Sequence, residues 1–367
     1  MRVLCVTQFS EIGGTSRLHA LQFFPHLERD YGMQISKVAI YSDRFFRMQM
    51  DLAGAGRKQK FFELAKGLLL GFFKKVILAF RAARYDVVFI QRETFPVFLY
   101  RILRVMNPHV AYQLEDAIYE ISPFLGGKSF LHRLLLRYQA HLCRRMMRGA
   151  AVVIAENEGI ATEARKHNTR VVIISAPIDS DRFRPISHAY GVGPVTIGWI
   201  GSPATTRLLA TIDPVFSALG AKYGARVRLK TVGAARDYTA PGIAMEKKDW
   251  SFDTEVADLQ SFDIGIMPLE DTPFEKGRLG GKMIFYMMTG VPFVASDAPL
   301  NRGAADDGVH GFFVSTHEQW VEKLSLLIED AALRSRMGGQ GRLRAKERFS
   351  LKSKIPLLAD ALKQAVA

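Results

Sequence analysis

Short apolar runs alternate with amphipathic stretches through the first half of the chain. The apolar runs predict buried strands at residues 2–7, 34–41, 87–91, 110–113, 152–155 and 171–174. Stretches with helical periodicity lie between these runs and begin near Ser16, Phe61, Phe95, Phe130 and Glu158. Because strands that alternate with helices are joined by right-handed crossovers, this half is predicted to form an α/β domain around a parallel sheet.

A second alternation of the same kind follows a polar break in the pattern. Residues 177–194 carry three prolines and two glycines, which is typical of a linker. The strands predicted beyond this break are residues 195–200, 227–232, 264–268, 291–295 and 311–314. The sequence therefore predicts two Rossmann-like, doubly wound domains, residues 1–176 and 195–350, and a final helix over 351–367.

The composition is that of a globular protein with an excess of basic residues. Of the 367 residues, 48% are hydrophobic and 23% are charged, and the formal net charge is +14. This charge indicates an anionic partner. The two cysteines, Cys5 and Cys143, lie in apolar or helical surroundings, which favours reduced thiols and a cytoplasmic location. No apolar run approaches the roughly 20 residues that span a bilayer.

Much of the basic charge lies in two predicted helices, residues 57–84 and 128–148. In the first, an apolar face is predicted from Phe61, Ala65, Leu68, Phe72 and Val76, with Lys66, Lys74, Arg81 and Arg84 opposite. Such a helix suits an anionic membrane surface, and a helix that buries its apolar face in the core is the alternative. No nucleic acid is expected as a partner, because no helix-turn-helix, zinc-finger or RNA-binding signature is present.

The segment 273–296 carries the most specific chemistry. A loop with Glu275, Lys276 and Arg278 precedes a predicted helix that has Lys282 near its start. Unpaired backbone N–H groups and the helix dipole favour an anion at such a helix N-terminus. A basic helix start beside a carboxylate fits a nucleotide diphosphate that carries a hydroxylated group.

This segment resembles the signature of the family 4 glycosyltransferases and their relatives, in the glycosyltransferase group 1 branch. That branch has a loop reading Glu-Arg-Gly-Lys-x-x-x-Lys before a Tyr-Met-Ala-x-Gly-x-Pro-Val-Val-Ala run. Residues 263–269, 308–314 and 337–342 resemble three further family segments in order and spacing. The resemblance implies the GT-B fold, in which two Rossmann-like domains enclose a cleft and the last helix returns to the first domain.

The function implied by the resemblance is sugar transfer from a nucleotide-diphosphate sugar to a glycan or lipid-linked acceptor, with retention of anomeric configuration. Cell-surface polysaccharide or glycolipid synthesis at the inner face of the membrane is the implied setting. Cations and helix dipoles stabilise a departing diphosphate, so no metal ion or other cofactor is expected. No histidine, cysteine or carboxylate cluster has the spacing of a metal site.

Donor-binding residues are implied in both domains. The paired glycines after the first strand let the backbone approach an anion, or form a purely structural turn. The turn after residues 195–200 offers backbone N–H groups to a phosphate. Many relatives add an Arg and a Lys there, but only Arg207 is present, which shifts the phosphate role toward Arg278 and Lys282. The residues assigned to the donor are Gly13, Gly14, Gly201, Ser202, Arg207 and Lys276.

The chain departs from the family at its pair of glutamates. Phe285 stands where the ribose-binding glutamate would be, and Gly277 stands at the place of the other. Glu275 lies just upstream and is the candidate carboxylate for the sugar; a solvated loop is the alternative for Glu275 and Lys276. The missing glutamates motivate a second function, a non-catalytic GT-B protein that binds a nucleotide sugar or a partner. A nucleotide-sugar epimerase would need further acid/base groups that the sequence does not place.

Acceptor contacts are expected in the first domain. Asp116 lies where the branch shows an Asp-x-Asp-Asp run, and it can bind hydroxyl groups or cap the next helix. Glu115 replaces another aspartate of that run. Arg92 can contact an anionic acceptor or pair with Glu93 or Glu115. The residues assigned to catalysis are Glu275, Asp116, Arg278 and Lys282, and those assigned to the acceptor are Arg92 and Glu115.

Overall fold

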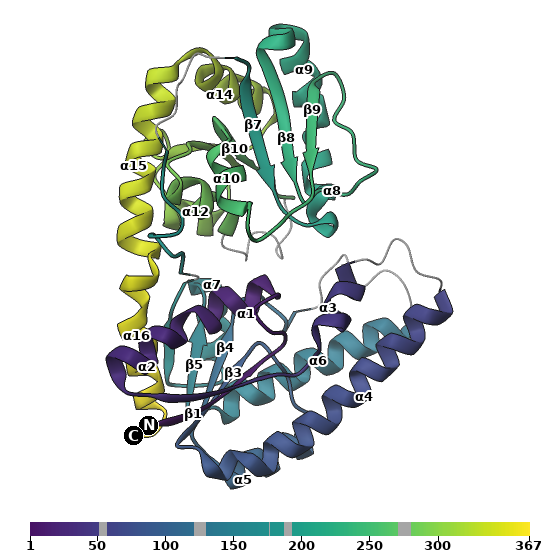
Figure 1. The fold of residues 1–367 in the computed structure, drawn as a ribbon, viewed down its shortest axis with the longest axis vertical. Coiled ribbons are helices and arrows are strands. Elements are labelled where there is room, and N and C mark those ends of the chain that lie inside the picture. The colour runs from purple at the N-terminus through teal and green to yellow at the C-terminus, as the bar shows by residue number, and fades with distance from the viewer. Residues whose placement is uncertain (51–56, 121–129, 176, 187–192, 271–279) are drawn as a thin grey trace. The chain divides into compact units, whose positions relative to one another are not determined.

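The chain divides into two compact units, each built around one six-stranded parallel sheet (Figure 1). The structure is a computed structural model, and it describes residues 1–50, 57–120, 130–175, 177–186, 193–270 and 280–367. The first unit consists of residues 1–177 with 352–367, and the second consists of residues 178–351. Among the described helices, none is long and apolar enough to cross a membrane.

The sheet of the first unit has the strand order β2-β1-β3-β4-β5-β6. Its strands are β1 (Arg2–Thr7), β2 (Gln34–Ala39), β3 (Val87–Gln91), β4 (Val110–Leu114), β5 (Val152–Ala155) and β6 (Val171–Ile173). Its helices and 3-10 turns are α1 (Gly14–His19), η1 (Leu21–Phe23), α2 (Phe24–Tyr31), α3 (Asp43–Met50), α4 (Arg57–Arg81), η2 (Ala82–Arg84), α5 (Val97–Met106), α6 (Phe130–Gly149), α7 (Glu158–Arg165) and α16 (Leu351–Gln364), whose first residue belongs to the second unit.

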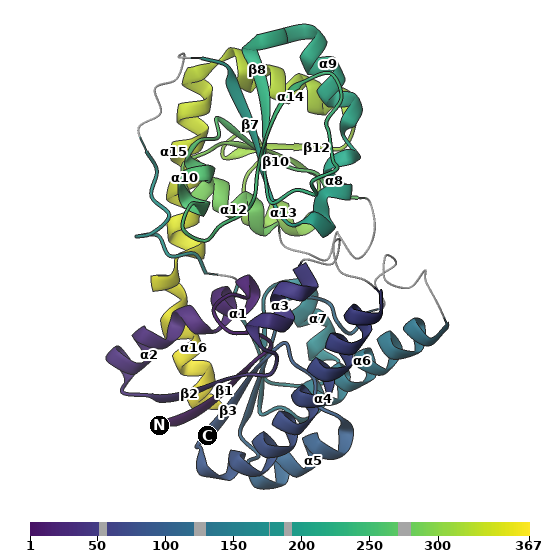
Figure 2. The same ribbon diagram turned by 45° about the vertical axis from the view of Figure 1, so that its right-hand side comes forward.

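The central strands of this sheet are buried on both faces. Helices α4 to α7 contribute to a core on one face, where Val88 and Tyr112 of the sheet pack with Leu99 and Met146 of the helices. Figure 2 shows α1, α2 and α16 on the other side of the sheet. Because helices cover both faces, β3, β4 and β5 are continuous apolar runs, the pattern from which they were predicted.

The sheet of the second unit has the strand order β12-β11-β10-β7-β8-β9. Its strands are β7 (Val195–Ile200), β8 (Val227–Val232), β9 (Ala244–Lys248), β10 (Ile264–Met267), β11 (Phe293–Ser296) and β12 (Gly311–Val314). Its helices and 3-10 turns are η3 (Pro203–Thr205), α8 (Thr206–Ala210), α9 (Asp213–Tyr223), η4 (Gly224–Arg226), α10 (Glu255–Gln260), α12 (Gly281–Met288), α13 (Pro299–Ala304), α14 (His317–Glu329) and α15 (Ala331–Phe349). One core lies under α9 and α14, and a second lies under α10, α12 and α15.

Two strands of the second unit differ from the prediction. The edge strand β9 was not predicted, because it is half-exposed and reads Ala-Met-Glu-Lys-Lys rather than as an apolar run. Strand β11 was predicted to begin at Val291 but begins at Phe293. The Val291 amide donates to the Tyr286 carbonyl at 2.9 Å and Gly290 has a φ of 76°, so Val291 still belongs to the end of α12.

The described part of the expected linker packs into the second unit. Ile178 exchanges backbone hydrogen bonds with Phe349 (2.7 Å) and Leu351 (2.9 Å). The guanidinium of Arg342 donates to the carbonyls of Ser180 at 2.9 Å and of Phe183 at 2.6 Å. These contacts fix the segment after Pro177 against α15. The end of the chain belongs to the first unit, where the His109 ring lies 3.0 Å from the Ala365 carbonyl.

Helix α4 does not bury Ala65, Leu68 and Phe72 in the core, which contradicts the second of the two alternatives for its predicted apolar face. Its buried side consists of Gly71, Lys75, Leu78 and Ala79, and continues to Ala82 in η2. Ala65, Leu68 and Phe72, which were expected to share an apolar face, are exposed. A Cβ on Gly71 would lie 3.0 Å from the Tyr41 ring and 3.1 Å from the Ile40 side chain, so the helix packs closely at this position. Gly71, Lys75 and the alanines thus form the face of α4 that packs on the core, and the predicted apolar face stays exposed at Ala65, Leu68 and Phe72.

Candidate functional site

The strand orders mark one position in each sheet where a ligand is expected. In the first unit β1 lies between β2 and β3, and in the second β7 lies between β8 and β10. Successive crossovers leave in opposite directions from these strands. In open α/β sheets, ligands bind outside the carboxyl ends of the strands at such a switch point. The segments that follow β1, β3, β7 and β10 are therefore the candidate ligand-binding positions.

The loop after β1 is closed by short-range hydrogen bonds. The Gly13 amide donates to the Ser10 carbonyl at 3.0 Å, and the Phe9 amide donates to the Ser16 hydroxyl at 3.2 Å. A Cβ on Gly13 would lie 2.8 Å from the Phe9 side chain, so Gly13 is needed for packing. A Cβ on Gly14 would meet nothing within 4 Å. Of the two glycines assigned to the donor, Gly14 is the one that faces open space.

A chain of buried polar side chains links the ends of β1, β3 and β4. The Ser16 hydroxyl donates to Gln91 Oε1 at 3.2 Å. Gln91 Nε2 in turn lies 3.1 Å from both carboxylate oxygens of Glu115. All three side chains are buried. Buried polar groups that satisfy one another in this way hold a fixed geometry.

Arg92 lies at the edge of this chain with two carboxylates beside it. Its Nη1 atom is 3.3 Å from Glu115 Oε1 and 3.0 Å from Asp116 Oδ2. Arg92 has a φ of 60°, and among the described residues it is the one residue other than glycine with a positive φ. Strained backbone of this kind costs of order 1–3 kcal/mol and is often found at functional sites.

The electrostatics of this cluster favour proton exchange near neutral pH. Burial raises the pKa of Glu115 to about 7, with Arg92 opposing the shift and Asp116 adding to it. Burial also lowers the pKa of His19 to about 4, so its imidazole is neutral at pH 7. His19 Nε2 lies 3.9 Å from Glu156 Oε1, at the end of β5.

The contacts of Arg92 and Asp116 bear on the alternatives left open for both residues. Arg92 pairs with Glu115 and Asp116, whereas the Glu93 carboxylate pairs with Lys75 of α4 at 2.7 Å. Asp116 enters a turn rather than a helix, and the next described helix begins at Phe130. The structure therefore brings together all three residues that the sequence placed in the first unit as catalytic or acceptor-binding.

Sequence reasoning missed His19 and Lys75. His19 falls on the same side of α1 as Ser16, which is a weak signal. Lys75 is buried, and its Nζ atom also donates to the Thr94 carbonyl at 2.7 Å. A lysine within a helix normally reaches solvent, so nothing in the local pattern indicated that this one is buried.

In the second unit, the turn after β7 is largely occupied by its own chain. The Gly201 amide donates to the Val232 carbonyl at 2.9 Å, and a Cβ on Gly201 would lie 2.4 Å from the Trp199 indole. The Ser202 amide donates to the Thr205 hydroxyl at 3.1 Å. The amides of Gly201 and Ser202, two of the residues assigned to the donor, thus have partners within the protein.

The cations assigned to the donor in this unit also have defined surroundings. Lys282 Nζ lies 4.4 Å from the centroid of the Trp199 ring, which places it beside β7. Arg207 pairs with Glu270 at 2.5 Å. Glu275, Lys276 and Arg278, as well as Gly277, lie outside the described residues.

Two aromatic residues of α12 show how this helix is held. The Tyr286 hydroxyl donates to the Ile266 carbonyl at 3.1 Å and accepts from the Ile200 amide at 3.4 Å, so it joins β10 to β7 at the switch point. The Phe285 ring lies 5.2 Å from the Phe183 ring. Phe285, at the position that the resemblance gives to a ribose-binding glutamate, therefore packs against the segment that follows Pro177.

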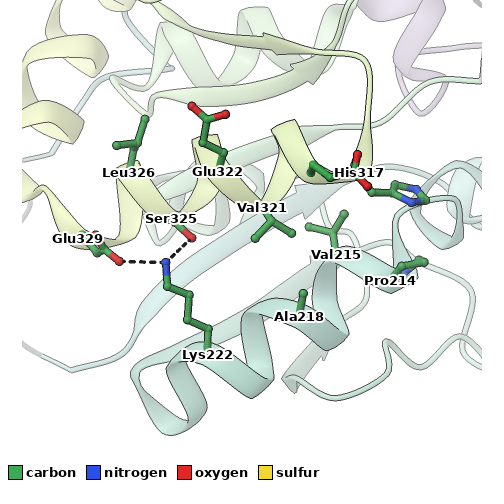
Figure 3. A pocket seen from close by; sticks show the side chains of 11 residues that line it. Pro214, Val215, Ala218, Lys222, His317, Val321, Glu322, Ser325, Leu326 and Glu329 are labelled. Atoms are coloured by element: carbon green, nitrogen blue, oxygen red, sulfur yellow. Dashed lines mark hydrogen bonds and ion pairs between the residues drawn. The ribbon is translucent and has the colours of Figure 1, made fainter.

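A cavity of about 460 Å³ opens at the carboxyl ends of β10, β11 and β12, and Glu270, Ser296, Asp297 and His317 contribute to its lining. A larger groove of about 620 Å³ runs between α9 and α14. Figure 3 shows Lys222 reaching across that groove, 3.3 Å from Glu329 and 3.2 Å from Ser325. Because all residues lining the groove belong to these two helices, the smaller cavity is the one at the strand ends.

In the described part of the chain, no three histidine, cysteine, aspartate or glutamate side chains are grouped so that they could hold a metal ion. The described polar groups at both switch points are instead cations, carboxylates and amides.

Solved structures of glycosyltransferases share this fold. HepE from Anabaena, solved with UDP and glucose, is 16% identical, with 99% of each chain covered and a TM-score of 0.66. A glycosyltransferase from Rickettsia africae is 11% identical, with 99% of this chain and 98% of that chain covered and a TM-score of 0.67. Sucrose-phosphate synthase from Thermosynechococcus elongatus is 13% identical, with the same coverage and a TM-score of 0.68. These similarities confirm the GT-B fold predicted from the sequence.

No family model matches the chain, and no curated protein matches it by sequence.

Proposed function

We propose that the protein is a retaining glycosyltransferase that moves a sugar from a nucleotide-diphosphate sugar to a glycan or lipid-linked acceptor. The observation that best supports this proposal is the gathering of polar residues at the switch point of each sheet of a GT-B fold. The proposed setting is cell-surface polysaccharide or glycolipid synthesis in the cytoplasm, with peripheral attachment to the inner face of the membrane.

The second unit is proposed to bind the donor. HepE has been solved with UDP and with UDP-glucose, and we propose a uridine nucleotide for this chain as well. Lys282 would neutralise charge on the diphosphate together with Arg278, because charge-assisted contacts strengthen as negative charge develops on a leaving group. Glu275 is proposed to orient the sugar hydroxyls, on the strength of its place in the sequence.

The first unit is proposed to bind the acceptor. Glu115 and Asp116 present carboxylate oxygens that can accept hydrogen bonds from hydroxyl groups, and Arg92 holds both in place. In the proposed reaction the acceptor oxygen bonds to the anomeric carbon on the face from which the diphosphate leaves. The bond from that carbon to the phosphate oxygen breaks, and the acceptor proton passes to the departing diphosphate.

The alternative is a non-catalytic protein that binds a nucleotide sugar or a partner. It is favoured by one observation, the use of Phe285 for packing where relatives have a ribose-binding glutamate. The two proposals share the donor site and differ in whether the bond to the anomeric carbon breaks.

Donor hydrolysis without acceptor tests the proposal. The protein would be incubated with a panel of UDP- and GDP-sugars while release of the nucleoside diphosphate is followed. We expect slow hydrolysis of one donor, with the first released sugar in the donor's own anomeric configuration by proton NMR. Binding of a donor without hydrolysis of any would favour the non-catalytic alternative. Failure to bind any nucleotide sugar would contradict both.

A further inference from the structure

The outward face of the first unit combines unburied aromatic residues with a cavity lined by arginines. On α4, five large apolar side chains lie opposite the buried face and form what we call the apolar stripe. The stripe consists of Phe62, Leu69, Phe73, Ile77 and Phe80, which are 76%, 58%, 55%, 56% and 54% exposed. A domain helix normally turns polar residues to this side, and an exposed apolar patch of this kind marks an interaction site.

The stripe continues onto the neighbouring helix α5. The rings of Phe72 and Phe98 lie 6.3 Å apart, and Phe98 and Val105 of α5 are both more than half exposed. Lys66 and Arg81 lie beside the stripe on α4 and are exposed. Figures 1 and 2 show α5 next to the end of α4.

A cavity of about 150 Å³ adjoins this surface between α5 and α6. Four exposed arginines line it and no acidic residue does; they are Arg101, Arg104, Arg145 and Arg148. The two helices approach closely at Gly149, where a Cβ would lie 2.7 Å from the Tyr100 ring. The dipole at the end of α6 stabilises Arg148, but Arg101 lies in the middle of α5 and gains nothing from it.

Like charges gathered around one cavity repel unless an anion lies among them. Guanidinium groups match the oxygens of a phosphate in geometry and charge. We propose that the arginine cavity binds the phosphate of an anionic phospholipid headgroup while the apolar stripe enters the interface of the same bilayer. The formal net charge of +14 complements a bilayer rich in acidic lipid.

This surface deepens the proposed peripheral location and needs no catalysis. Vesicle flotation without any nucleotide sugar measures membrane binding directly. If the protein does not float with vesicles, the transferase proposal is unaffected. We expect the protein to float with vesicles of phosphatidylglycerol and phosphatidylcholine, and not with phosphatidylcholine alone. Binding should weaken as salt is raised, because screening reduces the attraction to acidic lipid.

Two pairs of substitutions test the two parts of the surface. Arg101→Gln with Arg145→Gln should weaken vesicle binding about thirtyfold, since each basic residue near acidic lipid contributes roughly 1 kcal/mol. Phe73→Ser with Phe80→Ser should weaken it at least about tenfold through lost apolar burial. The matched controls lie on exposed helices of the second unit: Arg336→Gln with Lys346→Gln, and Leu326→Ser with Leu343→Ser. Both controls should bind like the parent protein.

Four results would overturn the proposal. Equal binding to neutral and acidic vesicles would show that the arginines do not select lipid with a net negative charge. If the test and control pairs lose vesicle binding equally, the membrane-binding surface is not this face. A dimer in sedimentation that dissociates on Phe73→Ser with Phe80→Ser, without vesicle binding by the parent, would make a second copy the occupant. Inorganic phosphate should compete only weakly with vesicles; full displacement at millimolar concentration would indicate a site for a free phosphate compound.

Discussion

The guanidinium of Arg92 lies 3.0 Å from the carboxylate of Asp116, across the carboxyl ends of β3 and β4. The same nitrogen lies 3.3 Å from Glu115, so one cation serves two adjacent carboxylates. The positive φ of Arg92 turns the chain sharply after β3. Such strain persists only where surrounding contacts compensate for it, and here these contacts are the two carboxylates.

The cluster formed by Gln91, Arg92, Glu115 and Asp116 has two buried members and two that solvent reaches. Gln91 and Glu115 are buried and joined by hydrogen bonds, whereas Arg92 and Asp116 keep about a quarter of their side-chain surface exposed. A ligand hydroxyl can therefore reach Asp116 without displacing the buried groups. This arrangement suits recognition of an acceptor.

Stability should depend on pH through Glu115. Its pKa in the folded protein is about 7, above the ordinary 4.5, so its contribution to stability is fully present below pH 4.5. The contribution falls as pH rises through 7, because the unfolded chain ionises first. The loss is about 3 kcal/mol. Between pH 5 and 8, the free energy of unfolding of Glu115→Gln, measured with urea, should therefore decrease less than that of the parent. Parallel pH profiles for the two proteins would refute the prediction.

Arg278 and Lys282 should both be needed to bind the donor diphosphate. Replacing either with Ala removes a charged hydrogen bond, which should weaken UDP binding by about 1.5–3 kcal/mol. Titration calorimetry measures this loss directly. Lys323→Ala is the control, because Lys323 lies on α14 and pairs with Glu322 at 2.7 Å. If both Arg278→Ala and Lys282→Ala bind UDP like the parent, the diphosphate site is elsewhere.

The sequence was most informative where local pattern determines structure. Strands β3, β5, β7 and β8 have the predicted bounds because buried parallel strands are unbroken apolar runs. Arg92, Glu115 and Asp116 could be expected near one another because they follow neighbouring strands of one sheet. Their distances, and the raised pKa of Glu115, depend on burial that no local pattern encodes.

The features that the sequence did not predict depend on contacts between distant segments. No local pattern indicates that Lys75 is buried beside Glu93. Of the two alternatives for the apolar face of α4, burial in the core is contradicted at Leu68 and Phe72, because Gly71, Lys75 and two alanines pack against the core in their place. Phe285 could be recognised as a departure from the family, but its packing partner, Phe183, lies in the segment expected to be a linker.

Glu275 should affect turnover and leave folding unchanged. Glu275→Gln keeps the shape of the side chain and removes its charge. If the carboxylate orients donor hydroxyls or stabilises positive charge at the anomeric carbon, the turnover rate should fall at least about a hundredfold. The melting temperature and UDP affinity should stay near the parent values. Full activity would assign Glu275 to a solvated loop, and loss of activity together with stability would make it a structural residue.

Lys75 should hold the Arg92 loop in place through Glu93. Lys75→Met leaves the Glu93 carboxylate buried without its cation, which should destabilise the fold by about 3–5 kcal/mol. Adding Glu93→Gln removes that charge, so the double variant should regain much of the loss. Lys166→Met is the control, because its pair with Glu163 is exposed and should contribute less than about 1 kcal/mol. Urea unfolding of the four proteins gives the coupling energy. If Lys75→Met and Glu93→Gln have additive effects, the pair does not hold this loop.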